Sequence, residues 1–440
     1  MNAVGLPGYQ EDNAASAPAD WVVLKIGEMT EVSAGGTPAT GNESYWFPPE
    51  VPWMSSGEVH KRRIYTTEKK ISALGLTNSA AKVFPKKSVV MALAGQGKTR
   101  GCVAVLEAEV ATNQSLAAIY PSKAFDTDFL FQNLDWRYKE LRSLSSGEGG
   151  RGGLNLSIIK SIPIELPPLP EQQKIASILT AMDDKLDVIA RQIEVTQTLK
   201  QGLMQTLFSR GVGTQDADGR WVPHAEFKDS ELGEIPAAWD IVEIQSIAEV
   251  IRGASPRPQG DPRYYGGDVP RLMGADVTRD GKWVTPQIDF LTQEGARRSR
   301  PCPKGTLTII CSGDVGIPSF LAVDACIHDG FLALININEG SANKNYLYHV
   351  ISSLRQRLDA SATHGGVFTN LTTTILKEFK LPLPSISEQE KIAAVLDAVD
   401  DKLTIAEKRH QHFQTLKRGL MQKLLTGQWR VNVDASAAGT

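Results

Sequence analysis

The sequence predicts an α+β protein with two mixed β-rich domains, separated by two long helices that form an antiparallel coiled coil with internal pseudo-two-fold symmetry. The first observation is a repeat: residues 171–207 match residues 388–424 at a constant offset of 217, with 20 of 37 positions identical. The second is that each matched segment follows a longer region of short β-branched runs between Gly/Pro turns, which is typical of strands. A duplicated module of this length predicts a molecule that makes each kind of contact twice.

The repeat divides the chain into seven predicted segments. They are a disordered leader (1–20), domain 1 (21–165), a first spacer helix (166–211), a linker (212–238), domain 2 (239–382), a second spacer helix (383–427) and a tail (428–440). The leader has neither the basic start nor the apolar core of a signal peptide. The residues between the halves are polar and rich in turn residues, so we interpret them as a linker.

The two matched segments are predicted helices with a coiled-coil seam. Their apolar residues alternate steps of four and three, and a 3.5-residue period is typical of a coiled coil. The predicted seam is Ile175, Leu179, Met182, Leu186, Ile189 and Ile193 in the first helix, and Ile392, Leu396, Val399, Leu403, Ala406 and His410 in the second. A helix of this size, about 55 Å long, cannot bury its own seam. We expect each copy to pair with the other, and an intramolecular two-fold makes that pair antiparallel.

Composition and charge limit the functional classes. An apolar content of 41% and a charged content of 22% are ordinary for a globular protein, and no long apolar run predicts a membrane span. The four cysteines show no metal-binding spacing, which favours reduced cysteines in a cytoplasmic protein. The net charge is −3, whereas a lone nucleic-acid binder is usually more basic. Any DNA role must therefore depend on local basic patches or on partners.

No catalytic motif is visible. Residues 94–99 (AGQGKT) resemble the end of a phosphate-binding loop, but Ala92 occupies the position of the first glycine, so we interpret the segment as a turn between strands. The adjacent pairs Asp183-Asp184 and Asp400-Asp401 would point about 100° apart on a helix. They cannot act as one acid/base pair, and a solvated face or a helix contact is favoured. The sequence thus predicts no catalytic and no metal-binding residue.

Basic residues cluster in both domains. The candidate DNA-binding residues are Lys61, Arg62, Arg63, Lys98 and Arg100 in domain 1, and Arg252, Arg257, Arg263, Arg271, Arg297, Arg298 and Arg300 in domain 2. Arginine suits both phosphate contacts and bidentate readout of guanine. Charge clusters are also common on solvated surfaces, and that interpretation stays open. Two similar scaffolds with different side chains, however, suit the reading of two different sequences.

Three stretches carry a resemblance to a known family. They are IPIELPPLPEQQKIASIL, which ends domain 1, LKQGLMQTLFSRG, which ends the first helix, and FKDSELGEIPAAW, which opens domain 2. Their order resembles that of the specificity (S) subunits of type I restriction-modification systems, over about residues 21–427. The resemblance implies two target-recognition domains, each reading one half of a bipartite asymmetric DNA site. It also implies that the helices set the spacing and dock two methyltransferase (M) subunits.

The same resemblance places the chemistry on other chains of a phage-defence complex. The M subunits would methylate adenine N6 with S-adenosylmethionine, and restriction (R) subunits would translocate and cleave DNA with ATP and Mg²⁺. This chain would hold no cofactor. Two alternatives stay open from the residues: a coiled-coil scaffold that binds only proteins, and an enzyme in its own right, either a P-loop NTPase or a fused methyltransferase.

Overall fold

The computed structural model describes residues 18–95, 99–144, 153–365 and 368–433. The chain divides into two units, which are Met1–Ala190 with Lys408–Thr440 (unit 1) and Arg191–Glu407 (unit 2). Each unit contains one of the predicted domains and half of each long helix. The boundary falls inside the helices because each half-helix contributes to the apolar core of its own domain. Most of the predicted leader and the last seven residues of the predicted tail lie outside the described residues.

The two long helices pack antiparallel. They are α6 (Leu169–Ser209) and α12 (Ile386–Leu425). In unit 1 the beginning of α6 and the end of α12 share one core, which includes Leu179 and Leu424. In unit 2 the end of α6 and the beginning of α12 share another, which includes Leu207 and Leu396. This confirms the predicted fold class, two mixed β-containing domains with paired long helices.

Each domain contains a five-stranded sheet with the same strand order. In unit 1 the order is β2 (Val32–Ala34), β10 (Leu116–Ile119), β7 (Val89–Ala92), β8 (Val103–Leu106) and β4 (Arg63–Ile64). In unit 2 it is β17 (Glu249–Arg252), β25 (Phe331–Ile335), β22 (Leu307–Ile310), β23 (Pro318–Leu321) and β19 (Trp283–Val284). Strand β7 is buried on both faces: Val89 and Met91 face the core shared with the helices, and Val90 and Ala92 face a second core. Its continuous apolar run is typical of such a doubly covered strand.

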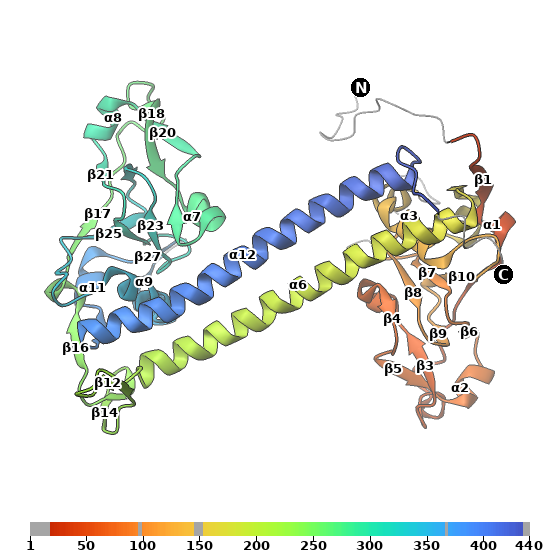
Figure 1. Cartoon of the computed structure of the whole chain (residues 1–440), viewed down its shortest axis with the longest axis horizontal. Coiled ribbons are helices and arrows are strands. Elements are labelled where there is room, and N and C mark those ends of the chain that lie inside the picture. The colour runs from red at the N-terminus through yellow and green to blue at the C-terminus, as the bar shows by residue number, and fades with distance from the viewer. Residues whose placement is uncertain (1–17, 96–98, 145–152, 366–367, 434–440) are drawn as a thin grey trace. The chain divides into compact units, whose positions relative to one another are not determined.

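A four-stranded sheet covers the other face of each five-stranded sheet. The order is β5 (Lys69–Ile71), β3 (Val51–Met54), β9 (Val110–Thr112) and β6 (Val83–Phe84) in unit 1. In unit 2 it is β20 (Asp289–Leu291), β18 (Tyr265–Leu272), β24 (Ala325–Ile327) and β21 (Arg300–Cys302). The pairing is equivalent as well, since Trp53 aligns with Ala111 as Arg271 does with Cys326, both in parallel. Within each unit the four-stranded sheet lies farther from the long helices than the five-stranded sheet (Figure 1).

Short strands and helices complete each unit. In unit 1 they are β1 (Val22–Lys25) paired with β11 (Pro163–Leu166), and helices α1 (Ile26–Met29), α2 (Ala73–Thr77), α3 (Thr127–Trp136), α4 (Tyr138–Ser143) and α5 (Leu156–Ser161), with 3₁₀ turns η1 (Glu43–Tyr45) and η2 (Ser56–Lys61). In unit 2 they are β16 (Asp240–Glu243) paired with β28 (Lys380–Leu383), β26 (Thr363–Gly365) paired with β27 (Phe368–Asn370), helices α7 (Gly274–Asp280), α8 (Gln293–Arg297), α9 (Lys344–Ser353), α10 (Arg355–Ser361) and α11 (Thr373–Glu378), and η4 (Ile244–Ser246).

The predicted linker is more ordered than its composition suggested. It forms two hairpins, β12 (Thr214–Gln215) with β13 (Trp221–Val222), and β14 (Phe227–Ser230) with β15 (Gly233–Pro236). The first hairpin turns at Asp218-Gly219, where Gly219 has a φ of 76°, so a recognisable hairpin signal was present in the sequence. None of the helices that the structure describes is both long enough and apolar enough for a membrane span.

Candidate nucleic-acid interface

The basic cluster of domain 1 makes ion pairs within unit 1. Lys61 pairs with Glu58 and Glu68, both at 3.0 Å. Arg62 directly follows η2 with a φ of 61°, which a non-glycine residue rarely adopts, and its guanidinium reaches two carboxylates. Arg63 pairs with two other carboxylates of domain 1, at 2.7 and 2.6 Å. DNA contact by these residues stays a prediction, and their ion pairs assign them a further, structural role.

One carboxylate of α6, that of Asp183, contacts three other side chains, and we call this set clasp 1. Asp183 lies 3.3 Å from the Arg62 guanidinium, accepts a hydrogen bond from Gln132 of α3 at 2.7 Å, and pairs with Lys417 of α12 at 2.5 Å. Arg62 also pairs with Asp135 at 2.9 Å and lies over the Phe131 ring. Burial opposes ionisation of Asp183, but Arg62 and Lys417 outweigh it and hold the pKa of this carboxyl below its usual range.

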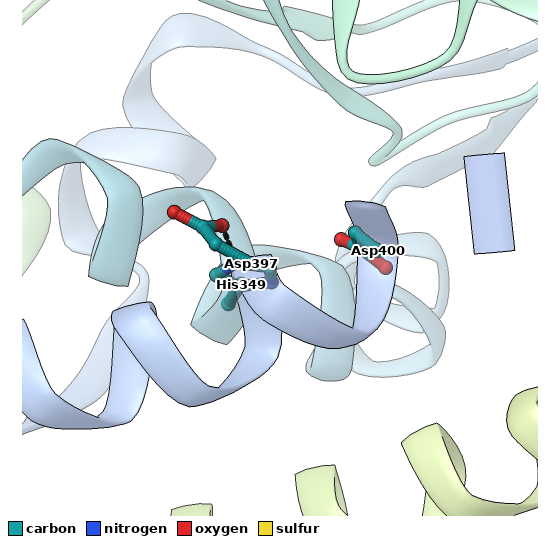
Figure 2. A group of neighbouring side chains, drawn as sticks. All are labelled: His349, Asp397 and Asp400. Atoms are coloured by element: carbon teal, nitrogen blue, oxygen red, sulfur yellow. Dashed lines mark hydrogen bonds and ion pairs between the residues drawn. The ribbon is translucent and has the colours of Figure 1, made fainter. Parts of the chain in front are cut away.

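Unit 2 has an equivalent arrangement, clasp 2, built from different residues. Asp397 of α12 pairs with Lys282 and accepts a hydrogen bond from Nε2 of His349, in α9, at 2.5 Å. Lys282 lies 4.9 Å from the centre of the Tyr348 ring. Figure 2 shows His349 and Asp397 side by side, with Asp400 one turn further along α12. Asp400 pairs with Lys200 of α6 at 2.6 Å.

Ligand atoms of His349, Asp397 and Asp400 lie within 4.8 Å of one another, which raises the question of a metal ion. Both carboxylates, however, already have an ammonium partner, Lys282 on Asp397 and Lys200 on Asp400. Burial is the main cause that lowers the pKa of His349, and nearby Lys282 acts in the same direction against Asp397. The charges of the cluster are therefore balanced by lysines, and its chemistry is that of an ion-pair network between a domain and a helix.

The arginines of domain 2 separate into buried and exposed groups. Arg271 is buried and pairs with Asp289, so it supports the four-stranded sheet. Arg263 forms a forked pair with Asp261, and it lies with Arg298 over the buried Tyr264 ring, at 5.2 and 4.6 Å from the centre.

A second arginine group surrounds Asp329. Arg257 lies 3.6 Å from its carboxylate, Arg252 donates to its carbonyl, and Arg300 donates to the carbonyl of Arg252. Arg297 is exposed on α8. Five exposed arginines thus gather on α8, β21 and the loop before β18: Arg257, Arg263, Arg297, Arg298 and Arg300. We call them the arginine patch.

Two residues remain from the predicted DNA-binding set. Lys98 lies outside the described residues, as do the neighbouring Gln96 and Gly97 of the loop-like motif. Arg100 is half-buried in the connection between β7 and β8, which pair antiparallel. The described ends of the motif therefore belong to a connection between neighbouring strands.

The predicted seam residues coincide with the least exposed side of both long helices. Each of its twelve residues is buried or half-buried. The same period continues through Thr196, Lys200, Leu203 and Leu207 in α6 and through Phe413, Lys417, Leu420 and Leu424 in α12. The two seam lysines, Lys200 and Lys417, were not among the predicted site residues, although a charged residue at the same heptad position in both copies is a readable signal. Gln132, His349 and Lys282 were not predicted either, because their roles depend on contacts distant in sequence.

A second, exposed apolar set occurs on both helices at equivalent positions. In unit 1 it is Val188 and Leu416, and in unit 2 it is Ile405 and Leu199, with Val195 beside them. Val188 lies five residues beyond Asp183, which places it about 140° around α6 from clasp 1. The same spacing separates Ile405 from Asp400. We call these exposed residues the outer stripe, because Val188 and Ile405 lie on a different side of their helices from the clasp carboxylates Asp183 and Asp400.

The geometry defines a class of protein: two equivalent mixed domains, each held by a clasp to the helix segments of its own unit, with different exposed cations on matching scaffolds. The model of the family described as type I restriction modification DNA specificity domain matches residues 18–197 and again residues 236–413. The chain therefore belongs to this family and contains two copies of its domain.

Known relatives agree with this assignment. The chain is 32% identical to the putative type I restriction enzyme MjaX specificity subunit of Methanocaldococcus jannaschii over 64% of its own length, a match that spans 62% of that protein. It is 24% identical to the MjaVIII specificity subunit of the same organism over 96% of both chains. Its fold is similar to that of the S subunit from M. genitalium, with a TM-score of 0.60 at 16% identity over 94% of this chain and 98% of that one.

Proposed function

We propose that this chain is the non-catalytic DNA-specificity subunit of a type I restriction-modification complex in the cytoplasm. Domain 1 and domain 2 each read one half of a bipartite asymmetric site, and α6 with α12 sets the spacing. The observation that supports this best is that two sheets of equivalent strand order and register carry different side chains. Methylation with S-adenosylmethionine and ATP-dependent cleavage belong to the partner chains. The alternative of a scaffold without specific DNA binding is not favoured by family membership.

Within this function, the arginine patch is our proposed DNA contact of domain 2. Its guanidinium groups are exposed, and those of Arg263 and Arg298 are held in place by stacking on Tyr264. Guanidinium groups held over a ring suit contacts with guanine or phosphate. Domain 1 has no arginine at the matching positions of α2, where Thr77 and Asn78 replace Arg297 and Arg298. The two half-sites are therefore contacted by different chemistry.

Footprinting and methylation of the reconstituted complex test this function. We expect protection of a bipartite site and methylation of one adenine in each half. Replacing Arg297 and Arg300 by Ala should weaken specific binding about tenfold or more and lower the salt slope of log K by about 2 if both contact phosphates. Arg220→Ala, an exposed arginine in the β12–β13 turn, is the matched control. A complex that protects no bipartite site would rule out the proposed function.

The outer stripe is our proposed docking surface for the two M subunits. It repeats once in each unit, so two copies of one partner can bind equivalent residues, and its exposed Val, Leu and Ile side chains gain free energy when covered. Val188→Glu combined with Leu416→Glu should remove one M subunit from the purified complex and leave the second. Gln411→Glu, the control, adds one negative charge to α12 about 140° around the helix from Leu416. Full M content in the double variant would place docking elsewhere.

A further inference from the structure

Each domain is attached to the long helices at two levels. In unit 1, Phe129 and Leu130 of α3 share an apolar core with Ile175 and Leu179 of α6. Clasp 1 lies one turn beyond this core, because Asp183 follows Leu179 by four residues, about 6 Å along the helix. In unit 2 the order is the same, with Leu396 in the apolar core and the carboxylates Asp397 and Asp400 directly after it.

The two levels constrain different degrees of freedom. Apolar burial holds the domain against the helix, but it is non-directional and tolerates small rotations. Charge-assisted hydrogen bonds depend on direction as well as distance. Clasp 1 joins three elements at a single carboxylate, since Arg62 and Gln132 come from the domain and Lys417 comes from α12. A domain that rotated about its apolar contact would break these bonds first.

We propose that clasp 1 and clasp 2 fix the angle of each recognition domain on the helices, and that Arg62 and Lys282 are thereby positioning residues for the spacing between the two DNA half-sites. The inference rests on the proposed function, because spacing has a meaning only for a bipartite site. It gives Arg62 a task that differs from the direct DNA contact expected from the sequence. A lost clasp should relax spacing without changing which bases are read.

Clasp 2 supports the same task with other residues. Lys282 replaces Arg62 as the cation, Tyr348 replaces Phe131 as the ring beneath it, and His349 replaces Gln132 as the α-helical donor. The ring and the donor occupy equivalent positions in α3 and α9, at the repeat offset of 217. An arrangement rebuilt in both halves from different side chains indicates a shared positional requirement.

The experiment uses the full chain in complex with its M subunits. Methylation is measured on duplexes that keep both half-sites and vary the spacer by one base pair in each direction. Arg62→Met and Lys282→Met should each reduce the preference for the native spacer by about tenfold, while single-base changes in either half-site are rejected as before. Lys139→Met in domain 1 and Lys304→Met in domain 2, both exposed, should keep the native preference.

A graded variant protects the test from loss of folding. Arg62→Lys keeps the charge but loses the fork that reaches both Asp135 and Asp183, so the spacer preference should fall by only about threefold. Spacer preference that stays native in the Met and Lys variants would overturn the inference. A strict spacer preference with a salt slope reduced by about 1 would also overturn it, and would make Arg62 a DNA contact. Absence of bipartite methylation by the unaltered complex would instead remove the proposed function, and the inference with it.

Discussion

Clasp 1 and clasp 2 show which parts of the duplicated molecule have been copied and which have been rebuilt. The helix-to-helix pairs are copies: Lys417 with Asp183 in unit 1 corresponds to Lys200 with Asp400 in unit 2, at the repeat offset of 217 for both residue types. The domain-to-helix pairs are not. Arg62 reaches Asp183 itself, whereas Lys282 reaches Asp397, one helical turn earlier than Asp183's counterpart.

The difference follows from what each contact must match. A helix-to-helix pair joins two matched segments, so the same residues serve in both units. A domain-to-helix pair joins a matched helix to a domain whose side chains differ between the halves. The cation can then occupy a different position in each domain, provided that a carboxylate is within reach on the helix. The two units should therefore respond differently to equivalent mutations.

The largest difference between the units in lost unfolding free energy is expected for mutations in the first turns of α6 and α12. Glu388 of α12 is buried and accepts hydrogen bonds from the backbone N–H groups of Val212 and Gly213, from His224 and from the indole of Trp239. Glu388→Ala should lower the free energy of unfolding of unit 2 by about 3 kcal/mol, because several buried donors lose their acceptor. Urea denaturation with amide hydrogen exchange over residues 212–224 measures this.

The counterpart in unit 1 is the comparison for that variant. Glu171 accepts from Arg430, whose guanidinium also pairs with Asp20 and is partly exposed. Glu171→Ala should therefore lower the free energy of unfolding by clearly less than Glu388→Ala does. Arg430, the donor left behind, still pairs with Asp20 and is hydrated. Equal losses in the two units would show that the linker contacts of Glu388 do not add stability.

The next largest effect concerns the seam pairs. Asp183→Asn leaves Lys417, a nearly buried lysine, without its carboxylate and should destabilise unit 1 by about 3 kcal/mol. Asp400→Asn should cost only about 1 kcal/mol, because the Lys200 side chain is 25% exposed and stays hydrated. The adjacent exposed residues Asp184 and Asp401 provide matched Asn controls. Identical losses at both seam positions would contradict the role assigned to burial.

The period of the predicted seam could be read from the sequence because its signal is local. A 3.5-residue period needs only the order of apolar residues along one helix. The predicted spacer helices, 166–211 and 383–427, exceed α6 and α12 by only two or three residues at each end. The strand order of the domains was not predictable in the same way, because it depends on pairing between residues far apart in the chain.

The clasps escaped prediction for the same reason. Arg62, Gln132, Asp183 and Lys417 meet at one point although they span most of unit 1's sequence. A run of basic residues such as Lys61-Arg62-Arg63 does not tell which cations face solvent, because the backbone conformation at the end of η2 decides the direction. The pattern also could not distinguish buried Arg271 from exposed Arg297. Charge clusters indicate where to look for a contact, but only the fold selects its partners.

The smallest expected effect is a pH dependence confined to clasp 2. His349 is fully buried and faces Asp397, Asp400 and Lys282, and burial is the main reason that its pKa lies below the usual value of about 6.5. The unfolded chain then binds a proton at a higher pH than the folded chain. The free energy of unfolding of unit 2 should be highest above about pH 6.5 and should fall as the pH decreases below that value.

His349→Gln isolates this effect because it copies Gln132, the residue at the equivalent position of domain 1. The variant should flatten the dependence of unit 2 stability between pH 7 and pH 5, measured by urea denaturation at each pH. Unit 1, whose clasp has an arginine and an amide in place of the lysine and the histidine, should show no such dependence over that interval, since its clasp contains no histidine and the pKa of Asp183 is shifted down, away from that interval. A pH dependence of unit 2 stability that persists in His349→Gln would mean that the titrating group lies outside clasp 2. The two clasps would then differ in their residues but not in their binding of protons.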